Sequence, residues 1–298
     1  MKQPARPRRL AALRDRWLEL AFAAPVLTVI VGTFVGTLLL TLALSFTASR
    51  TLPVAHWLGL AQYARLWHNE RWLSSVANLL VYAFSTVGLS LAAGIAIAIA
   101  LDRSPRVENL MRTVVLYPQA TSFIVTGLVW QWLMTPSIGV QAALKLAGWD
   151  TTARVWLSDP TTAIFAVALA ASWQASGLVA VIVLSAIKGI DRDTCRAAAL
   201  DGVPAWRIYT SVVLPQVRGA IVAAALLLLM GSVKTYDLVV AMTHGGPGTA
   251  TELPAKFTMA YLWERQNVGL ASASATSLLL AIVVVMACGA LLRRGRKV

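Results

Sequence analysis

The chain has 298 residues, of which 58% are hydrophobic and only 13% are charged. A soluble globular domain is about half apolar and about a quarter charged, so this composition indicates a protein whose main solvent is lipid. The net charge of +13 would suggest nucleic acid in a soluble protein, but its position along the chain favours membrane topology, and we expect no nucleic-acid partner. Two cysteines and three histidines are scattered along the chain, so we expect neither a disulfide framework nor a metal site.

Apolar segments follow one another along the whole chain. Five stretches without a charged residue each exceed the about 20 residues that a helix needs to cross the hydrocarbon core, and a sixth is interrupted only by Lys234 and Asp237. Isolated strands would leave backbone groups unpaired in lipid. The sequence therefore predicts an all-α integral membrane protein with spans at about 20–47, 75–101, 113–135, 161–187, 219–241 and 267–292, which together form a membrane domain over 20–292.

Lysine and arginine are distributed unevenly between the predicted loops. With both termini placed in the cytoplasm, that side holds 18 of them and the opposite side holds 7. Cytoplasmic loops carry the excess of positive charge in membrane proteins. We therefore expect an N-in, C-in topology with a basic N-terminus at 1–19, a long cytoplasmic loop at 188–218 and a basic tail at 293–298. The first apolar run is longer than the core of a signal peptide, so we expect it to be retained as a span.

The long cytoplasmic loop carries a helix-turn-helix pattern. Residues 196–200 have high helix propensity. Gly202 can form a left-handed cap after them, Pro204 can begin a second helix, and Pro215 is expected to end that helix before the next span. A short, nearly flat Ala-rich helix suits docking into a groove of another protein. An ordinary loop helix lying on the membrane surface remains the alternative.

This loop resembles the "EAA" coupling motif of binding-protein-dependent ABC importers. The motif runs E-A-A-x-x-D-G-A with a downstream L-P. Two positions depart from it, because Arg196 stands where Glu is usual and Val203 where Ala is usual. The residues that the resemblance assigns to coupling with an ATPase are Arg196, Ala197, Ala198, Asp201, Gly202, Leu214 and Pro215.

A second stretch, 235–280, resembles the C-terminal part of carbohydrate-uptake permeases of the maltose/glycerol-3-phosphate type. The matching residues are Asp237, Leu238, Thr243, Gly245, Gly246, Pro247, Gly248, Thr251, Glu252, Gly269, Ala271, Ser272 and Ala273. The Gly245-Gly246-Pro247 sequence predicts a tight turn with positive φ on the periplasmic side. Residues 116–136 and 253–273 look most like the glucose/mannose branch of these permeases.

The resemblance implies a six-transmembrane-helix ABC importer permease bundle in a bacterial-type cytoplasmic (inner) membrane. Such a subunit forms half of a sugar translocation pathway and works by alternating access. The implied partners are a second, non-identical permease subunit, two ATPase subunits and an extracytoplasmic sugar-binding protein. The chain has no P-loop pattern, so we expect no cofactor and no catalysis in it, with ATP and Mg bound by the partner ATPases.

Polar residues inside the predicted spans are the candidates for the sugar path. Lys234 and Asp237 are three residues apart and should share one face of the fifth span, where they could line a cavity, form a structural ion pair, or let Lys234 reach the outer interface. An aromatic face with a nearby amide suits a sugar, although Trp at a span end is more often an interface anchor. The candidate residues are Gln131, Trp173, Gln174, Lys234, Tyr236 and Asp237.

Two other classes of function fit this sequence less well. An ion-coupled secondary transporter or channel would also have six spans and intramembrane charge. It would not explain the helix-turn-helix loop, and the spans lack a series of acidic residues for a proton relay. A membrane-bound enzyme would need a catalytic constellation, and the sequence contains neither H-E-x-x-H nor G-x-S-x-G.

Overall fold

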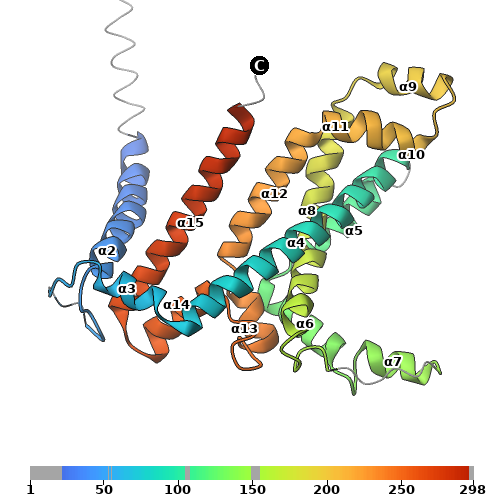
Figure 1. The fold of residues 1–298 in the computed structure, drawn as a ribbon. Coiled ribbons are helices and arrows are strands. Elements are labelled where there is room, and N and C mark those ends of the chain that lie inside the picture. The colour runs from blue at the N-terminus through green and yellow to red at the C-terminus, as the bar shows by residue number, and fades with distance from the viewer. Residues whose placement is uncertain (1–21, 53, 55, 105–107, 149–154, 295–298) are drawn as a thin grey trace, which may run out of the picture.

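The computed structural model describes residues 22–52, 54, 56–104, 108–148 and 155–294. Within these residues the regular structure is helical, apart from one isolated antiparallel bridge between Thr47 and Trp57. The predicted basic N-terminus at 1–19 lies outside the described residues, as do residues 295–298 of the predicted tail. Figure 1 shows an elongated bundle whose long helices run between two ends.

Four helices among the described residues are long and apolar enough to cross a membrane. Asn69 begins the second of them, because its side chain accepts hydrogen bonds from the backbone N–H groups of Arg71 and Trp72. As a result this helix begins five residues before the predicted span. The first is Phe22–Ser45, which contains η1 (Val31–Val35) and α2 (Gly36–Ser45). The other three are α4 (Glu70–Arg103), α8 (Ala163–Lys188) and α15 (Val268–Arg294).

Two further segments reach the same hydropathy only as bent pairs, which brings the number of candidate spans to six when each pair counts once. In the first pair, α5 (Glu108–Ala120) and α6 (Phe123–Met134) meet at 96°. Ser122 caps α6 by accepting from the N–H of Val125. The predicted continuous helix at 113–135 is therefore wrong, since a new helix starts in its middle.

The second pair joins the helical stretch Ala205–Gln216 to α12 (Arg218–Val233) at 70°. Pro215 lies inside this stretch, and the helix ends only after Gln216, so the prediction that Pro215 ends it misses by one residue. The predicted fifth span at 219–241 is also divided, because α12 ends at Val233 and α13 (Asp237–Thr243) begins after a break.

Short helices gather at the two ends of the bundle. Figure 1 shows α9, α10 and α11 at the end where α15 finishes, and α3, α7, α13 and α14 at the opposite end. We call these the inner and outer ends, after the predicted orientation. The remaining bounds are α3 Ala61–Trp67, α7 Val140–Leu146, α9 Arg192–Leu200, α10 Ala205–Ile208, η2 Tyr209–Val213, α11 Leu214–Gln216, α14 Pro254–Met259 and η3 Ala260–Glu264.

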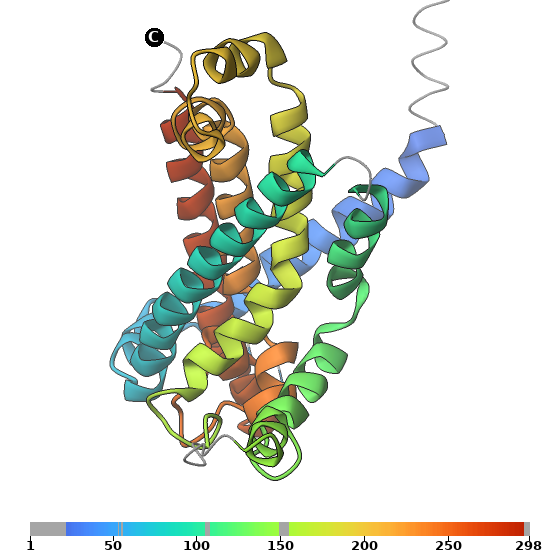
Figure 2. The ribbon, with the colours of Figure 1, turned by 90° about the vertical axis from the view of Figure 1, so that its right-hand side faces the viewer.

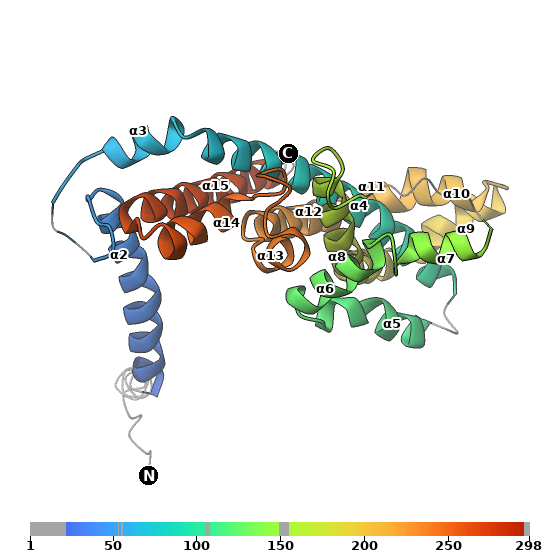
Figure 3. The same cartoon turned by 90° about the horizontal axis from the view of Figure 1, so that it is seen from below.

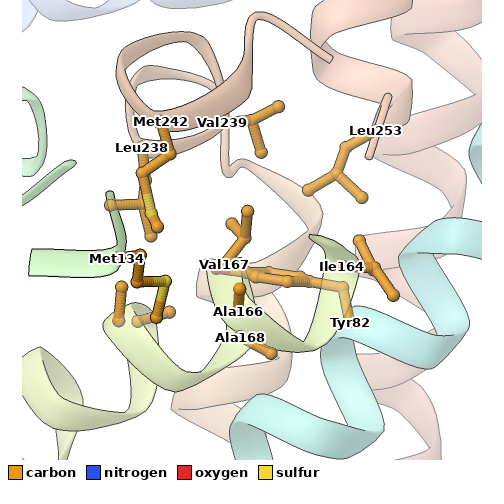
Figure 4. Close-up of a cluster of buried hydrophobic side chains, with 12 residues drawn as sticks. Tyr82, Met134, Ile164, Ala166, Val167, Ala168, Leu238, Val239, Met242 and Leu253 are labelled. Atoms are coloured by element: carbon orange, nitrogen blue, oxygen red, sulfur yellow. The ribbon is translucent and has the colours of Figure 1, made fainter. Parts of the chain in front are cut away.

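The centre of the bundle is the crossing of α4 and α8. Gly94 lets these two helices approach closely, because a Cβ at that position would lie 2.5 Å from the Cβ of Val179. Figure 4 shows the middle part of the core, where Tyr82 of α4 and Val167 of α8 pack below Leu238 and Met242 of α13. Two other buried clusters fill the inner and the outer end.

The first helix stands away from this bundle. Figure 1 shows it beside α15, and Figures 2 and 3 show it leaning away from the other helices. None of its apolar 18-residue window is buried within the chain. Its apolar side chains, including Phe22 and Phe34, are exposed. Lipid or another protein must cover this helix, because water would be a poor solvent for it.

Candidate functional site

Both breaks in the apolar segments border one cavity. The α5–α6 break contributes Gln119 and Phe123, and the α12–α13 break contributes Lys234 through Asp237. The cavity has a volume of about 330 Å³, and its other polar lining residues include Tyr82 of α4 and Gln174 of α8. Irregular backbone at membrane depth is stable only where protein or a water-filled cavity satisfies its polar groups. The meeting of two such breaks marks this cavity as the candidate site.

Gln174 stabilises the first break. Its side chain is buried, and its Nε2 donates to the backbone carbonyl of Thr121 at 2.9 Å. Its Oε1 is buried and has no hydrogen-bond partner among the described residues. Gly177, one turn further along α8, allows α5 to come this close, because a Cβ there would lie 2.1 Å from the carbonyl oxygen of Val115. The amide of Gln174 thus replaces a hydrogen bond that a continuous helix would have made.

The second break holds two opposite charges. Lys234 follows the last residue of α12, and Asp237 is the first residue of α13. The prediction that they share a face of one helix is therefore wrong. Both are exposed and line the cavity, and within the described part of the chain they form no ion pair with each other. Thr235, between them, lies 3.3 Å from the hydroxyl of Tyr82, a contact that ties the break to α4.

The structure divides the six residues predicted for the sugar path. It brings Gln174, Lys234, Tyr236 and Asp237 together at the cavity. Gln131 instead lines a separate hollow at the outer end, and Trp173 packs edge-on against Trp130 with ring centroids 6.0 Å apart. Sequence reasoning missed Tyr82, Gln119, Phe123 and Thr235. The capping serine at 122 was a signal for the first break, but the surrounding apolar run concealed it.

The predicted periplasmic turn forms a compact structure at the outer end. Gly245 has φ 93°, a left-handed conformation that favours glycine. The hydroxyl of Thr251 donates to the carbonyl of Gly246 at 2.8 Å. Gly246 and Pro247 share the outer hollow, of about 460 Å³, with Gln131. We call residues 244–253 the outer turn.

Two polar side chains of α4 hold the outer turn. The Nδ2 of Asn78 donates to the carbonyls of Thr249, at 2.8 Å, and of Glu252, at 3.0 Å. The Nε of Arg71 donates to the Oε2 of Glu252 at 2.6 Å, and the Glu252 side chain is only 3% exposed. A buried charge needs a paired partner, so the Arg71–Glu252 pair fixes the outer turn on the beginning of α4.

The inner segment, residues 190–216, has the predicted helix-turn-helix form. Gly202 has φ 74°, and its N–H donates to the carbonyl of Ala199, while the N–H of Val203 donates to that of Ala198. These are the hydrogen bonds of a glycine cap at the end of α9. Nothing lies within 4 Å of a Cβ built on Gly202, so the turn faces open space.

The residues assigned to coupling lie on different sides of this segment. Ala198 and Leu214 pack against the inner core, and Asp201 is exposed. Arg196, the departure from the motif, is exposed and pairs with Asp193 at 3.0 Å. Ala197 lies in α9 and Pro215 in α11. Their role in coupling stays a prediction, as does the role of the cavity residues in sugar transport.

Comparisons with known proteins agree with this architecture. A probable ABC transporter permease protein of Pyrococcus horikoshii is 35% identical over 269 residues, which cover 89% of this chain and 91% of that protein. The xylose/arabinose import permease protein XacH of Haloferax volcanii is 29% identical over 80% of this chain and 76% of its own length. The trehalose/maltose permease protein MalF of Thermococcus litoralis is 26% identical, with 80% and 81% covered.

The fold itself is similar to that of a solved transporter. A chain in the crystal structure of a bacterial ABC transporter that imports the acidic polysaccharide alginate superposes with a TM-score of 0.83. The sequences are 17% identical, and the match covers 98% of this chain and 100% of that chain. The family model described as "binding-protein-dependent transport system inner membrane component" matches residues 90–297. This chain belongs to that family of membrane-embedded transport subunits.

Proposed function

We propose that this chain is a permease subunit of an ABC sugar importer and that the cavity at the two breaks is part of its sugar path. One observation carries the second proposal: Lys234 and Asp237 line an otherwise mostly apolar cavity without pairing with each other. Unpaired charges inside a membrane domain are costly and usually serve function. An ammonium and a carboxylate can both hydrogen-bond to sugar hydroxyls, and Tyr236 adds an aromatic ring at the same place.

The names of the relatives support a sugar as the cargo, since one is an importer of xylose or arabinose and another of trehalose or maltose. Because the sequence resembles the glucose/mannose branch, glucose and mannose are the first sugars to test in uptake assays. An ion-coupled secondary transporter is not favoured, because the family consists of subunits of binding-protein-dependent systems.

The charged pair of the cavity can be tested by removing each charge. In the complete transporter reconstituted in vesicles, Lys234→Gln and Asp237→Asn should each lower sugar uptake by about tenfold, because a hydrogen bond to a charged group contributes about 1.5–3 kcal/mol. Uptake is measured with saturating sugar-loaded binding protein, and ATP hydrolysis is recorded alongside. Lys145→Gln, which removes an exposed lysine of α7 far from the cavity lining, is the matched control. Uptake unchanged in both cavity variants would reject the sugar path proposed here.

We also propose the partners that such a subunit needs. They are a second, non-identical permease, two ATPase subunits that bind ATP and Mg, and an extracytoplasmic sugar-binding protein, assembled in the cytoplasmic membrane. A solved structure of the alginate transporter contains a periplasmic protein with bound alginate pentasaccharide, which supports a binding protein in the assembly. The exposed α9 and its turn are the proposed contact with an ATPase.

The contact with the ATPase is tested at Gly202. Gly202 has a positive φ, so an Asp at this position should be strained by about 1 kcal/mol. Because its side chain would meet nothing within the chain, Gly202→Asp should still leave the permease folded. Its added charge would face the partner instead, so co-purification of the ATPase subunit and sugar uptake should both be lost. Uptake at the normal rate by Gly202→Asp would contradict the docking proposal.

A further inference from the structure

The inner segment is joined to the bundle through two bends in the chain. On one side α8 ends at Lys188 and α9 begins at Arg192. On the other side the segment meets α12 at 70°. Bends between helices absorb changes in φ and ψ and act as hinges. A movement of α9 is therefore transmitted to the spans mainly through side-chain contacts of the segment, because no continuous helix connects them.

Those contacts are made in the inner core, to which α4, α8 and α12 all contribute buried side chains. Ile208 and Val213 are buried in the inner core together with Leu101, and apolar contacts of this kind have no fixed direction. A polar contact with α4 does have a fixed direction. The hydroxyl of Tyr209 donates to the Oδ2 of Asp102 at 2.7 Å, and the two residues are 107 positions apart in the sequence. A hydrogen bond to a carboxylate is directional and among the stronger ones in proteins.

The helix that carries Asp102 contacts three regions of the molecule. α4 is a single α-helix of 34 residues, which corresponds to about 50 Å at about 1.5 Å per residue. Near its middle, Tyr82 lines the cavity and contacts Thr235 of the second break. At its other end, Arg71 and Asn78 hold the outer turn. One rigid element thus contacts the inner segment, the cavity and the outer turn.

We propose that α4 transmits the movement of the inner segment to the cavity and the outer turn, and that the Tyr209–Asp102 hydrogen bond fastens the inner segment to it. This inference rests on the proposed function, since it takes an ATPase as the source of the movement. Tyr209 is then a positioning residue for transport. It holds α4 in register with the ATPase-driven segment and takes no part in binding the sugar.

Removing one hydroxyl tests this inference in the complete transporter. In Tyr209→Phe the ring remains to pack against the inner core, so the protein should fold and bind its ATPase as before. Sugar taken up per ATP hydrolysed should fall by about tenfold, because the lost hydrogen bond is to a charged group. The matched control is Thr210→Val, which removes the neighbouring hydroxyl, whose bond goes to the carbonyl of Arg207 in its own helix.

Variants at Asp102 separate coupling from folding. Asp102→Asn keeps an acceptor for the tyrosine hydroxyl and should retain more of the uptake per ATP than Asp102→Ala. A ratio in Tyr209→Phe equal to that of the wild type would overturn the inference and leave the proposed function intact. Failure of the wild-type chain to associate with any ATPase would instead overturn the proposed function.

Cross-linking tests whether the inner segment and α4 move together. Asp102→Cys and Tyr209→Cys are combined in a chain whose Cys195 and Cys288 are replaced by serine, and a bifunctional thiol reagent joins the new thiols. If the inner segment and α4 move as one body, cross-linking should raise the uptake per ATP above that of the unlinked protein. Loss of uptake on cross-linking would show that the contact must open during transport, and would overturn the inference.

Discussion

The outer turn and the inner segment each contain a glycine with positive φ and an ion pair, but the two regions are stabilised differently. In the outer turn Thr251 is 0% and Glu252 is 2% exposed, and their partners come from the chain itself. In the inner segment Leu200 is 88% and Trp206 is 65% exposed, although both are large apolar residues. Exposed apolar side chains grouped in this way mark interaction surfaces. The comparison shows that the outer turn is held by residues of this chain, whereas the inner segment leaves large apolar side chains that this chain does not cover.

Ion pairs illustrate the same contrast. In the Arg71–Glu252 pair of the outer turn the side chains are 27% and 3% exposed, whereas in the Arg196–Asp193 pair of the inner segment they are 74% and 80% exposed. Water screens the second pair almost completely, so it adds little to stability. Its charges remain available to a partner, and Arg196 presents a positive charge where the family motif has a negative one.

The largest expected effect on the stability of the chain comes from breaking the buried pair. Glu252→Ala should lower the free energy of unfolding by about 3 kcal/mol, because it leaves the Arg71 guanidinium without its carboxylate in a mostly buried place. Denaturant unfolding of the purified chain in detergent measures this. The matched variant in the inner segment, Asp193→Ala, should change the same quantity by less than about 0.5 kcal/mol. Equal effects of the two variants would remove the distinction between the regions.

A smaller effect is expected at Asn78. Asn78→Ala removes two hydrogen bonds to backbone carbonyls of the outer turn and should cost about 1–2 kcal/mol. Cleavage within residues 244–253 by an added protease should become faster, because the turn would be less firmly held on α4. Protection as strong as in the wild type would mean that Arg71 alone holds the turn.

Gly202 and Gly245, which both have a positive φ, provide a matched pair across the molecule. Gly202→Ala and Gly245→Ala should each cost about 1 kcal/mol, because both positions have positive φ and an L-residue is strained there. A Cβ at 202 would meet nothing, and one at 245 would lie at an ordinary 3.6 Å from the Cβ of Glu252. The two losses in thermal stability should therefore be similar. A much larger loss at 245 would show that the outer turn tolerates no adjustment.

The smallest effect on the chain alone is expected at the exposed apolar residues. Leu200→Ser and Trp206→Ala should change the free energy of unfolding by less than about 0.5 kcal/mol, as is usual for surface positions. Both should nevertheless weaken co-purification of the ATPase by about tenfold or more, since Trp is often a central contact of an interface. Unchanged co-purification would place the docking surface elsewhere on the inner end.

Some of this protein could be predicted from its sequence because the physical signal is local. Long charge-free runs require helices in lipid, and the long helices α4, α8 and α15 end within a few residues of the predicted limits, apart from the earlier start of α4. The conformation of Gly202 also followed from its place after a helix-forming run. The resemblance of a short motif in the cytoplasmic loop and of the longer stretch 235–280 agreed with the family that the comparisons establish.

Other features were decided only by the tertiary structure. A run of apolar residues permits a continuous helix or a broken one, and the choice depends on whether freed backbone groups find partners elsewhere, as the carbonyl of Thr121 does at Gln174. The meeting of two breaks at one cavity, the separation of Gln131 and Trp173 from it, and the Tyr209–Asp102 bond likewise join residues far apart in the chain. Composition and periodicity describe each segment separately. Which polar groups meet depends on how the helices cross, and their packing sets that crossing.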